Sequence, residues 1–286
     1  MTREERVAVF ENTVKIAQKG KYISPLNEEI VIQDTDRMIE GTKFYSRKAN
    51  VDFHTIARFD TNIKVVNKDC LLAARDLFMD GYDPAVLNMA SFSKPGGGVL
   101  NGSAAQEENL FRRTNLFQSL YMFDYVGNNF KIKQREERYP LDYNFGGIYT
   151  PYVTVFRDSE DANYEYRDDP YSVSIISVAA VKKPQLTKDG KLQPWTVDLL
   201  KNKISQIFSI ALENGHTSIV LSAFGCGAYG TPPTEMARLF DEMLKGDTFR
   251  GAFENVVFAI IDDNNSFASH NPKGNYKPFV DIFGNG

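Results

Sequence analysis

The sequence is poor in the residues that build disulfide frameworks and zinc sites. It contains only two cysteines, Cys70 and Cys226, and three histidines, His54, His216 and His270. Two cysteines are too few for a disulfide framework, and the histidines form no metal-ligand spacing with them. We therefore expect reduced thiols and no structural zinc. We likewise expect no metal and no cofactor at the active site.

Long apolar runs are missing as well. The first residues, Met1–Arg6, lack the apolar core of a signal peptide, and no run approaches the roughly 18 apolar residues that a membrane span needs. A net charge of -4 gives no electrostatic reason to expect bulk affinity for nucleic acid. We expect a cytoplasmic protein without a membrane or nucleic-acid partner, in which any phosphate is held locally.

The N-terminal part of the chain begins with a helical pattern. Val7, Phe10, Val14 and Ala17 recur at helical spacing and predict an amphipathic helix over residues 4–18. Residues 21–60 show no strong period and are expected to form short strands or loops that cover the core or a pocket.

From Ile63 onward short apolar runs alternate with longer amphipathic ones, which favours an α/β fold with helices on both faces of a sheet. Residues 125–169 interrupt this pattern and are interpreted as an insertion or lid, with one strand at 148–155, while residues 264–286 are expected to pack on the body of the protein. The expected strands cover residues 63–66, 85–90, 173–181, 217–224 and 256–262, and the expected helices cover residues 71–79, 104–123, 194–214 and 233–245.

The most informative segment is the loop that follows the strand expected at 85–90. Its three consecutive glycines, Gly96–Gly98, remove every Cβ from a stretch of backbone, which permits positive φ and close approach of amide groups to a ligand. The carboxyl end of a strand is also where α/β sheets place their ligands. A merely flexible loop is the alternative interpretation of the glycines.

Two glutamates follow this loop. Ser103 and Gln106 have the spacing of a capping box, which places Glu107 and Glu108 in the first turn of the next helix. Acidic residues are common at helix N-termini for dipole reasons alone. Beside a glycine-rich loop, however, adjacent carboxylates about 100° apart on a helix can face two parts of one ligand.

A second glycine-rich loop follows the strand expected at 217–224 and precedes a helix with Pro233 near its start. Backbone amides from Gly225 to Tyr229 could form an anion-binding nest there, and Tyr229 or Phe224 could stack on a ring. Two such loops at one sheet edge fit a ligand with a diphosphate in its middle.

The spacing of three glycines, seven residues and then Gln106–Glu108 resembles the signature of bacterial-type poly(ADP-ribose) glycohydrolases, whose catalytic core is a macrodomain. The resemblance implies a macrodomain-like three-layer α/β/α fold with a mixed central sheet over residues 61–286. Residues 1–60 are then a helical extension packed on that domain in a single compact unit. Tyr229 stands where the family is expected to have Phe. Further similar segments occur in the family's order: Val65–Cys70, Val86–Ser91, Arg112–Leu116, Thr150–Asp158 and Phe224–Tyr229.

The resemblance also implies the activity. It implies hydrolysis of ribose–ribose O-glycosidic bonds with release of ADP-ribose, and the substrate is poly(ADP-ribose) or an ADP-ribosylated protein. We expect the protein to be a monomer. Glu108 is implied as the acid/base and Glu107 as the residue that orients the distal ribose, with help from the substrate's diphosphate. The implied substrate-binding residues are Asp69 at the adenine, Asn88 and Ser91 at the ribose, Gly96, Gly97, Gly98, Val99 and Gln106 at the first loop, and Gly225, Cys226, Gly227, Ala228 and Tyr229 over the diphosphate.

Other functions share parts of this pattern. An ADP-ribose reader without turnover would need only the two glycine loops, and a hydrolase of mono-ADP-ribosyl bonds would keep the same pocket. A dinucleotide-dependent dehydrogenase is disfavoured, because neither loop has the G-x-G-x-x-G spacing at a first strand-to-helix turn. The sequence leaves open the preference between polymer and single units, and between internal and terminal cleavage.

Overall fold

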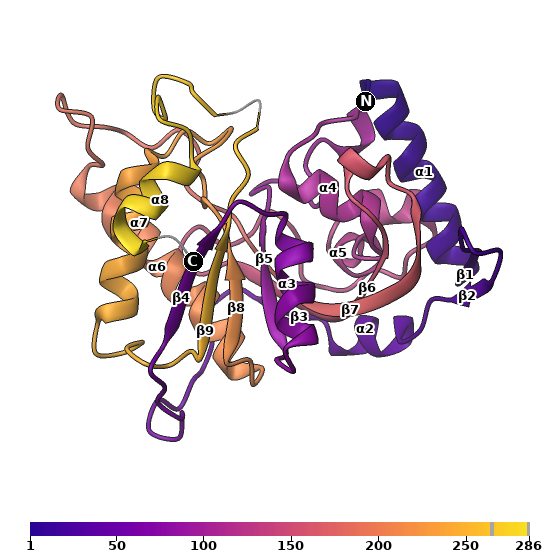
Figure 1. The fold of residues 1–286 in the computed structure, drawn as a ribbon, viewed down its shortest axis with the longest axis horizontal. Helices are drawn as coiled ribbons and strands as arrows, with labels where there is room; N and C mark the ends of the chain where they lie inside the picture. The colour runs from indigo at the N-terminus through magenta and orange to yellow at the C-terminus, as the bar shows by residue number, and fades with distance from the viewer. Residues whose placement is uncertain (264–265, 285–286) are drawn as a thin grey trace. The chain divides into compact units, whose positions relative to one another are not determined.

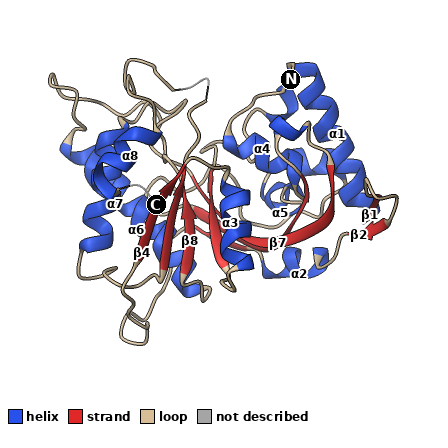
Figure 2. Ribbon diagram, in the orientation of Figure 1, coloured by secondary structure: helices blue, strands red, loops and turns tan. Residues whose placement is uncertain are grey.

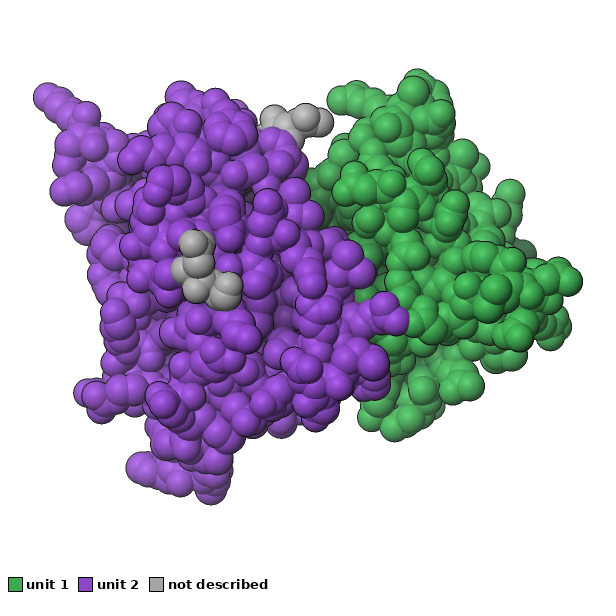
Figure 3. All heavy atoms as spheres, viewed as in Figure 1, with its two compact units in different colours: residues 1–44, 90–141, 148–177 green, residues 45–89, 142–147, 178–286 purple. Residues whose placement is uncertain are grey.

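The computed structural model describes residues 1–263 and 266–284, so residues 264–265 and 285–286 of the predicted packed C-terminal stretch lie outside the described part. The chain divides into two compact units (Figure 3). Unit 1 comprises residues 1–44, 90–141 and 148–177, and unit 2 comprises residues 45–89, 142–147 and 178–286. These boundaries differ from a division at residue 60, and the domain scheme stays a prediction.

The first helix of unit 1 confirms the predicted N-terminal helix. Helix α1 spans Arg3–Lys19, one residue longer at each end than expected. Thr2 and Glu5 form a capping box at its start, and Gly20 ends it with φ 73°, a conformation that glycine adopts without steric cost. The following short elements are β1 (Lys21–Ile23), β2 (Glu29–Val31), α2 (Thr35–Gly41) and β3 (Lys43–Tyr45).

The prediction of one helix over residues 104–123 is wrong. The chain leaves the helix at Thr114, whose backbone is extended and forms a bridge with Val155. The Thr114 hydroxyl donates to the carbonyl of Leu110 and accepts from the amide of Leu116, which stabilises the break. The segment instead contains the 3-10 helix η1 (Val99–Asn101), α4 (Gln106–Arg113), α5 (Phe117–Leu120), η2 (Tyr121–Phe123) and η3 (Tyr125–Phe130).

Two long strands complete unit 1. Strand β6 (Gly147–Arg157) pairs antiparallel with β7 (Tyr166–Val178), with Ile148 opposite Ser177, and η4 (Glu160–Ala162) lies in the connection. The interpretation of residues 125–169 as an insertion is therefore wrong for β6 and for the start of β7, which belong to the body of the fold. The polar outer end of β7 hides its strand character in the sequence.

Unit 2 has the alternating architecture that the apolar runs predict. Its strands, drawn in red in Figure 2 and labelled in Figure 1, follow the order β5-β8-β9-β4 and are all parallel, with Ile63 opposite Val256 and Ala85 opposite Ile219. The elements are β4 (Asn62–Val66), α3 (Cys70–Met79), β5 (Pro84–Met89), α6 (Pro194–Glu213), β8 (Ser218–Leu221), α7 (Pro233–Lys245), β9 (Asn255–Ala259) and α8 (Tyr276–Phe283).

The last helix packs on unit 2, as expected for the described part of the C-terminal stretch (Figure 1). Phe279 is fully buried, and its ring centroid lies 5.2 Å from that of Phe258 on β9. With parallel strands in one unit and antiparallel strands in the other, the predicted mixed α/β fold is confirmed. In the part of the chain that the structure describes, no helix is both long and apolar enough to cross a membrane.

Candidate active site

The first glycine loop has the backbone conformation that glycine was expected to supply. Gly96 and Gly97 have φ values of 72° and 51°, in the left-handed region that L side chains rarely adopt. Gly98 has φ -103° and precedes η1, where Val99 is buried. The loop therefore depends on glycine for its shape at two of its three glycine positions.

Glu107 is a buried carboxylate that the loop backbone holds at both oxygens. Its Oε2 accepts the amide of Ser91 at 2.8 Å, and its Oε1 accepts the amide of Gly96 at 3.0 Å. Only 3% of the residue is exposed. Because backbone amides donate to both of its oxygens, Glu107 is suited to anchor the loop.

Glu108 is held at one oxygen only. Its Oε1 accepts the amide of Gly98 at 2.8 Å, whereas its Oε2 is buried and has no hydrogen-bond partner among the residues that the structure describes. A buried polar atom that lacks a partner carries a desolvation cost, and such atoms are rare in folded proteins. The two oxygens of Glu108 therefore differ, one fixed by the loop backbone and the other without a donor among the described residues.

Gly97 lies directly against both carboxylates. A Cβ at this position would be 2.6 Å from Oε1 of Glu108 and 3.1 Å from Oε2 of Glu107. A Cβ at Gly96 would similarly be 2.6 Å from Cε1 of Phe111. The glycines therefore allow the loop to approach the acidic side chains and the aromatic ring beneath it more closely than any other residue would.

The predicted capping box is wrong. The N-cap of α4 is Ala105, which provides no side-chain hydrogen bond, and Gln106 is the first helical residue. The side chain of Ser103 lies against Gly98 instead, where a Cβ on Gly98 would be 2.3 Å from its Oγ. Glu107 and Glu108 still fall in the first turn of the helix, as predicted.

Asp69 and Asn88 lie at the carboxyl ends of parallel strands in unit 2. Asp69 is the N-cap of α3, where its Oδ1 accepts the amides of Leu71 and Leu72 at 3.0 and 3.2 Å. Asn88 is fully buried near the end of β5. The observed contacts of Asp69 give it a structural role at a helix start, and a role at an adenine stays a prediction.

The second glycine loop follows β8 in the same unit. Gly225 has φ 76°, and a Cβ there would be 2.7 Å from the Cβ of Ala180. Ala228 is exposed and Tyr229 partly exposed, whereas Phe224 is fully buried and is therefore not available to stack on a ligand. Of the two predicted stacking residues, only the partly exposed Tyr229 is accessible for stacking on a ligand ring.

The carbonyl of Cys226 connects this loop to the segment after β9. It accepts from Nε2 of His270 at 2.8 Å and from Nδ2 of Asn271 at 3.4 Å. The Cys226 thiol is completely buried, and burial raises its pKa well above the usual range. The thiol is consequently unsuited to nucleophilic chemistry, in agreement with a contribution of this residue through its backbone.

The predicted residues thus form two groups, one in each unit. Unit 1 brings together the first loop, the amide of Ser91 and the start of α4, and unit 2 contains the remaining predicted residues at the carboxyl edge of its parallel strands. Sequence reasoning missed Phe111, His270 and Asn271. Nothing in the sequence around these residues indicates their contacts. His270, for example, contacts Cys226, which is 44 positions away in the sequence.

No candidate metal centre was identified. Within residues 1–263 and 266–284, no three His, Cys, Asp or Glu side chains are arranged so that they could hold a metal ion. The acidic pair on α4 accepts hydrogen bonds from backbone amides of the first loop and of Ser91.

Comparison with known proteins identifies related molecules. A model of the microbial-type PARG catalytic domain matches residues 10–158. A solved structure of poly(ADP-ribose) glycohydrolase from Thermomonospora curvata bound to the inhibitor ADP-HPD is 30% identical, with a TM-score of 0.77, and the match covers 97% of this chain and 99% of that chain. The poly(ADP-ribose) glycohydrolase of Deinococcus radiodurans in complex with ADP-ribose is 26% identical, with a TM-score of 0.66, and the match covers 88% of this chain and 98% of the other.

A second structure of the Thermomonospora curvata enzyme matches nearly as well, at 29% identity and a TM-score of 0.76, over 98% of this chain and 100% of that chain. A search of curated proteins found no match. The structural matches confirm the predicted macrodomain-like α/β fold.

Proposed function

The chain belongs to the microbial-type PARG catalytic-domain family, and we propose that Glu108 is the acid/base of its reaction. The protein is a poly(ADP-ribose) glycohydrolase, a glycosidase that hydrolyses poly(ADP-ribose). The proposal concerns which residues perform this hydrolysis and how they divide the work.

The buried, unpartnered Oε2 of Glu108 is the observation that carries the proposal. A general acid needs a protonated oxygen that is directed at the leaving group and not occupied by another donor. The bond from Gly98 fixes the other oxygen at 2.8 Å, so the carboxyl group keeps one orientation while its free oxygen acts. Glu107 lacks such an oxygen, because backbone amides occupy both of its oxygens.

The reaction follows from these roles. Glu108 Oε2 donates its proton to the glycosidic oxygen that leaves the anomeric carbon, and the bond between that carbon and oxygen breaks to give an oxocarbenium-like centre. The Glu108 carboxylate then accepts a proton from the water that attacks this centre. Many glycosidases instead place two carboxylates on opposite sides of the bond. Adjacent glutamates on one helix, with Glu107 committed to the loop, favour a single acid/base.

The remaining predicted residues are proposed to bind the substrate. The backbone of Gly96–Val99, with Ser91 and Gln106, would contact the distal ribose and diphosphate, and Glu107 would orient the ribose. Backbone amides of Gly225–Tyr229 would hold the diphosphate, because amides of a glycine-rich loop before a helix are suited to anions. Asn88 would line the ribose site and Asp69 the adenine site. ADP-ribose is the proposed product, and a monomeric state and cytoplasmic location stay predictions.

The test combines product analysis with binding. Wild-type protein is incubated with poly(ADP-ribose) and, separately, with a mono-ADP-ribosylated peptide, and free ADP-ribose is quantified while its binding is measured by calorimetry. We expect release from the polymer by the wild type, together with binding but little release by Glu108→Gln, in which an amide oxygen still accepts from Gly98. Release from the peptide alone would identify a mono-ADP-ribosyl hydrolase, and binding without release by the wild type would identify a reader.

A further inference from the structure

Helix α4 carries the acidic pair at its start and a fully buried arginine near its end. Arg112 is completely buried, and its Nε donates to the hydroxyl of Tyr164 at 2.9 Å. Its guanidinium carbon lies 5.5 Å from the centre of the Tyr164 ring. Both terminal guanidinium nitrogens are buried without a hydrogen-bond partner, so this one hydroxyl is the acceptor of the group within the described residues.

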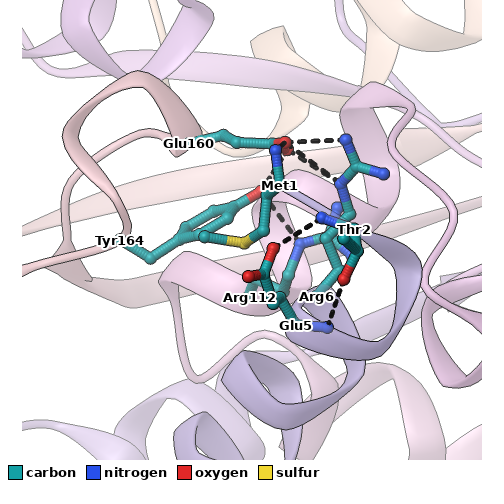
Figure 4. A network of polar contacts seen from close by, with 7 residues as sticks. All are labelled: Met1, Thr2, Glu5, Arg6, Arg112, Glu160 and Tyr164. Atoms are coloured by element: carbon teal, nitrogen blue, oxygen red, sulfur yellow. Dashed lines mark hydrogen bonds and ion pairs between the residues drawn. The ribbon is translucent and has the colours of Figure 1, made fainter.

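Tyr164 is itself fixed by a second layer of contacts (Figure 4). Its hydroxyl donates to Oε2 of Glu160 at 3.2 Å, and both oxygens of Glu160 accept from Arg6 on α1. The hydrogen bond from Arg6 keeps the pKa of Glu160 below its ordinary value, while burial raises the pKa of Tyr164. The phenol therefore stays protonated and the carboxylate ionised, which maintains the donor–acceptor order from Arg112 to α1.

The backbone of Tyr164 indicates that this arrangement is held against a conformational cost. Tyr164 and the preceding Asn163 both have φ 53°, in the left-handed region that is unfavourable for a bulky side chain. The Tyr164 carbonyl accepts from Nη1 of Arg157 at 2.7 Å, and its amide donates to Ser159 at 3.0 Å. Strained residues persist where surrounding contacts over-determine them, and they are enriched at functional sites.

Helical geometry connects this network to the acidic pair. Arg112 is four residues after Glu108, so the two side chains lie on the same face of α4 about one turn apart. Thr13 of α1 also donates to the Arg112 carbonyl at 2.6 Å. Because a two-turn helix moves as one body, a shift of Arg112 is transmitted to the carboxylate of Glu108.

We infer that Tyr164 is a positioning residue for the hydrolysis: by holding Arg112 it fixes the direction of α4 and thereby the placement of the Glu108 carboxyl group. The inference rests on the proposed role of Glu108. It also gives helix α1, through Arg6 and Glu160, a part in catalysis without contact with the substrate.

Tyr164→Phe tests the inference, because it removes the hydroxyl and keeps the ring. Tyr166→Phe is the matched control in the same hairpin: the Tyr166 hydroxyl accepts from Nη2 of Arg157 at 2.9 Å and donates to Asn12 on α1, and among the described residues no hydrogen bond joins it to Arg112. A misplacement of about 1 Å costs roughly a hundredfold in rate. We expect kcat of Tyr164→Phe to fall by about ten- to a hundredfold, with KM and the Kd for ADP-ribose within about threefold of wild type.

Two readouts separate positioning from simple destabilisation. The rate is divided by the ADP-ribose binding stoichiometry from calorimetry, which counts folded molecules. The pH profile of kcat is expected to shift in Tyr164→Phe, because a displaced Glu108 has different surroundings, whereas simple destabilisation would leave the profile unchanged. Tyr164→Phe leaves the buried Arg112 charge without its acceptor and could fold poorly for that reason. In that case Arg112→Met serves as the second variant, because it removes the buried charge itself. Arg112→Met is expected to lose as much kcat as Tyr164→Phe, and the double variant no more than either.

The failures of the two proposals are distinguishable. If the wild type releases ADP-ribose, Glu108→Gln does not, and Tyr164→Phe keeps wild-type kcat per folded molecule, the positioning role is refuted and the role of Glu108 stands. Additive losses in the double variant would also refute the role, because Tyr164 would then act independently of Arg112. If Glu108→Gln retains wild-type release, the proposed acid/base role fails first.

Discussion

Replacing Gly97 with alanine would place a methyl group between the two carboxylates at the start of α4. The new Cβ would lie 2.6 Å from Oε1 of Glu108 and 3.1 Å from Oε2 of Glu107, whereas ordinary contact begins at 3.4 Å. Glu108 must therefore retreat by roughly 1 Å, and a displacement of that size costs about a hundredfold in rate. The φ of 51° adds about 1–2 kcal/mol of backbone strain to the folded state.

A matched substitution isolates the backbone contribution. Gly20→Ala, at the C-cap of α1, has a similar positive φ of 73°, but nothing lies within 4 Å of its Cβ. We expect Gly20→Ala to lose about 1–2 kcal/mol in the free energy of unfolding, measured with urea, and Gly97→Ala to lose at least as much, because its Cβ also displaces Glu108. Only Gly97→Ala should lose about a hundredfold in kcat for ADP-ribose release. If its kcat stays within about twofold of that of Gly20→Ala, the close packing of loop and carboxylates does not control the reaction.

Three further predictions concern unit 2. In the described part of the chain the buried Lys203 ammonium has no hydrogen-bond partner, and burial lowers its pKa to about 8. Because the unfolded chain keeps that proton up to about pH 10.5, wild-type stability should rise with pH between these values. Lys203→Met should add on the order of 3 kcal/mol to the free energy of unfolding at pH 7, and an unchanged stability would contradict the buried charge. Burial raises the pKa of the Cys226 thiol, so this thiol should resist iodoacetamide at about pH 8 until the protein is unfolded. Peptide mass spectrometry measures the labelling, and labelling of the native protein would show that the loop opens. His270→Ala should weaken ADP-ribose binding about tenfold in calorimetry by removing the shorter of the two hydrogen bonds to the Cys226 carbonyl, whereas unchanged affinity would mean that the His270 bond does not hold the loop.

The parts of the fold that could be predicted are those that local pattern determines. The parallel strands of unit 2 are continuous apolar runs, and the period of α7 and its first proline predict its bounds, Pro233–Lys245, without error. The break at Thr114 could not be predicted, because it depends on a bridge to Val155, which is distant in sequence. The outer end of β7 was missed for a related reason, since polar residues there pair with β6 and leave no apolar signal.

The candidate site shows the same division. Glycines and adjacent acids are visible in the sequence, and their spacing predicts that the first loop and Glu107–Glu108 belong together. The sequence does not reveal that Glu107 is bonded at both oxygens and Glu108 at one, because this depends on side-chain direction. It also hides Tyr164, whose contact with Arg112 joins residues 52 positions apart.

The central claim, that Glu108 transfers the proton, is tested most directly by changing the leaving group. Rates of the wild type and Glu108→Gln are compared on poly(ADP-ribose) and on an ADP-ribose whose anomeric carbon carries a nitrophenoxy group, which departs as nitrophenolate without protonation. We predict that the rate of Glu108→Gln falls about a thousandfold on the polymer. On the nitrophenyl substrate we predict a fall of about a hundredfold or less. Equal losses on both substrates would contradict a proton donor at Glu108.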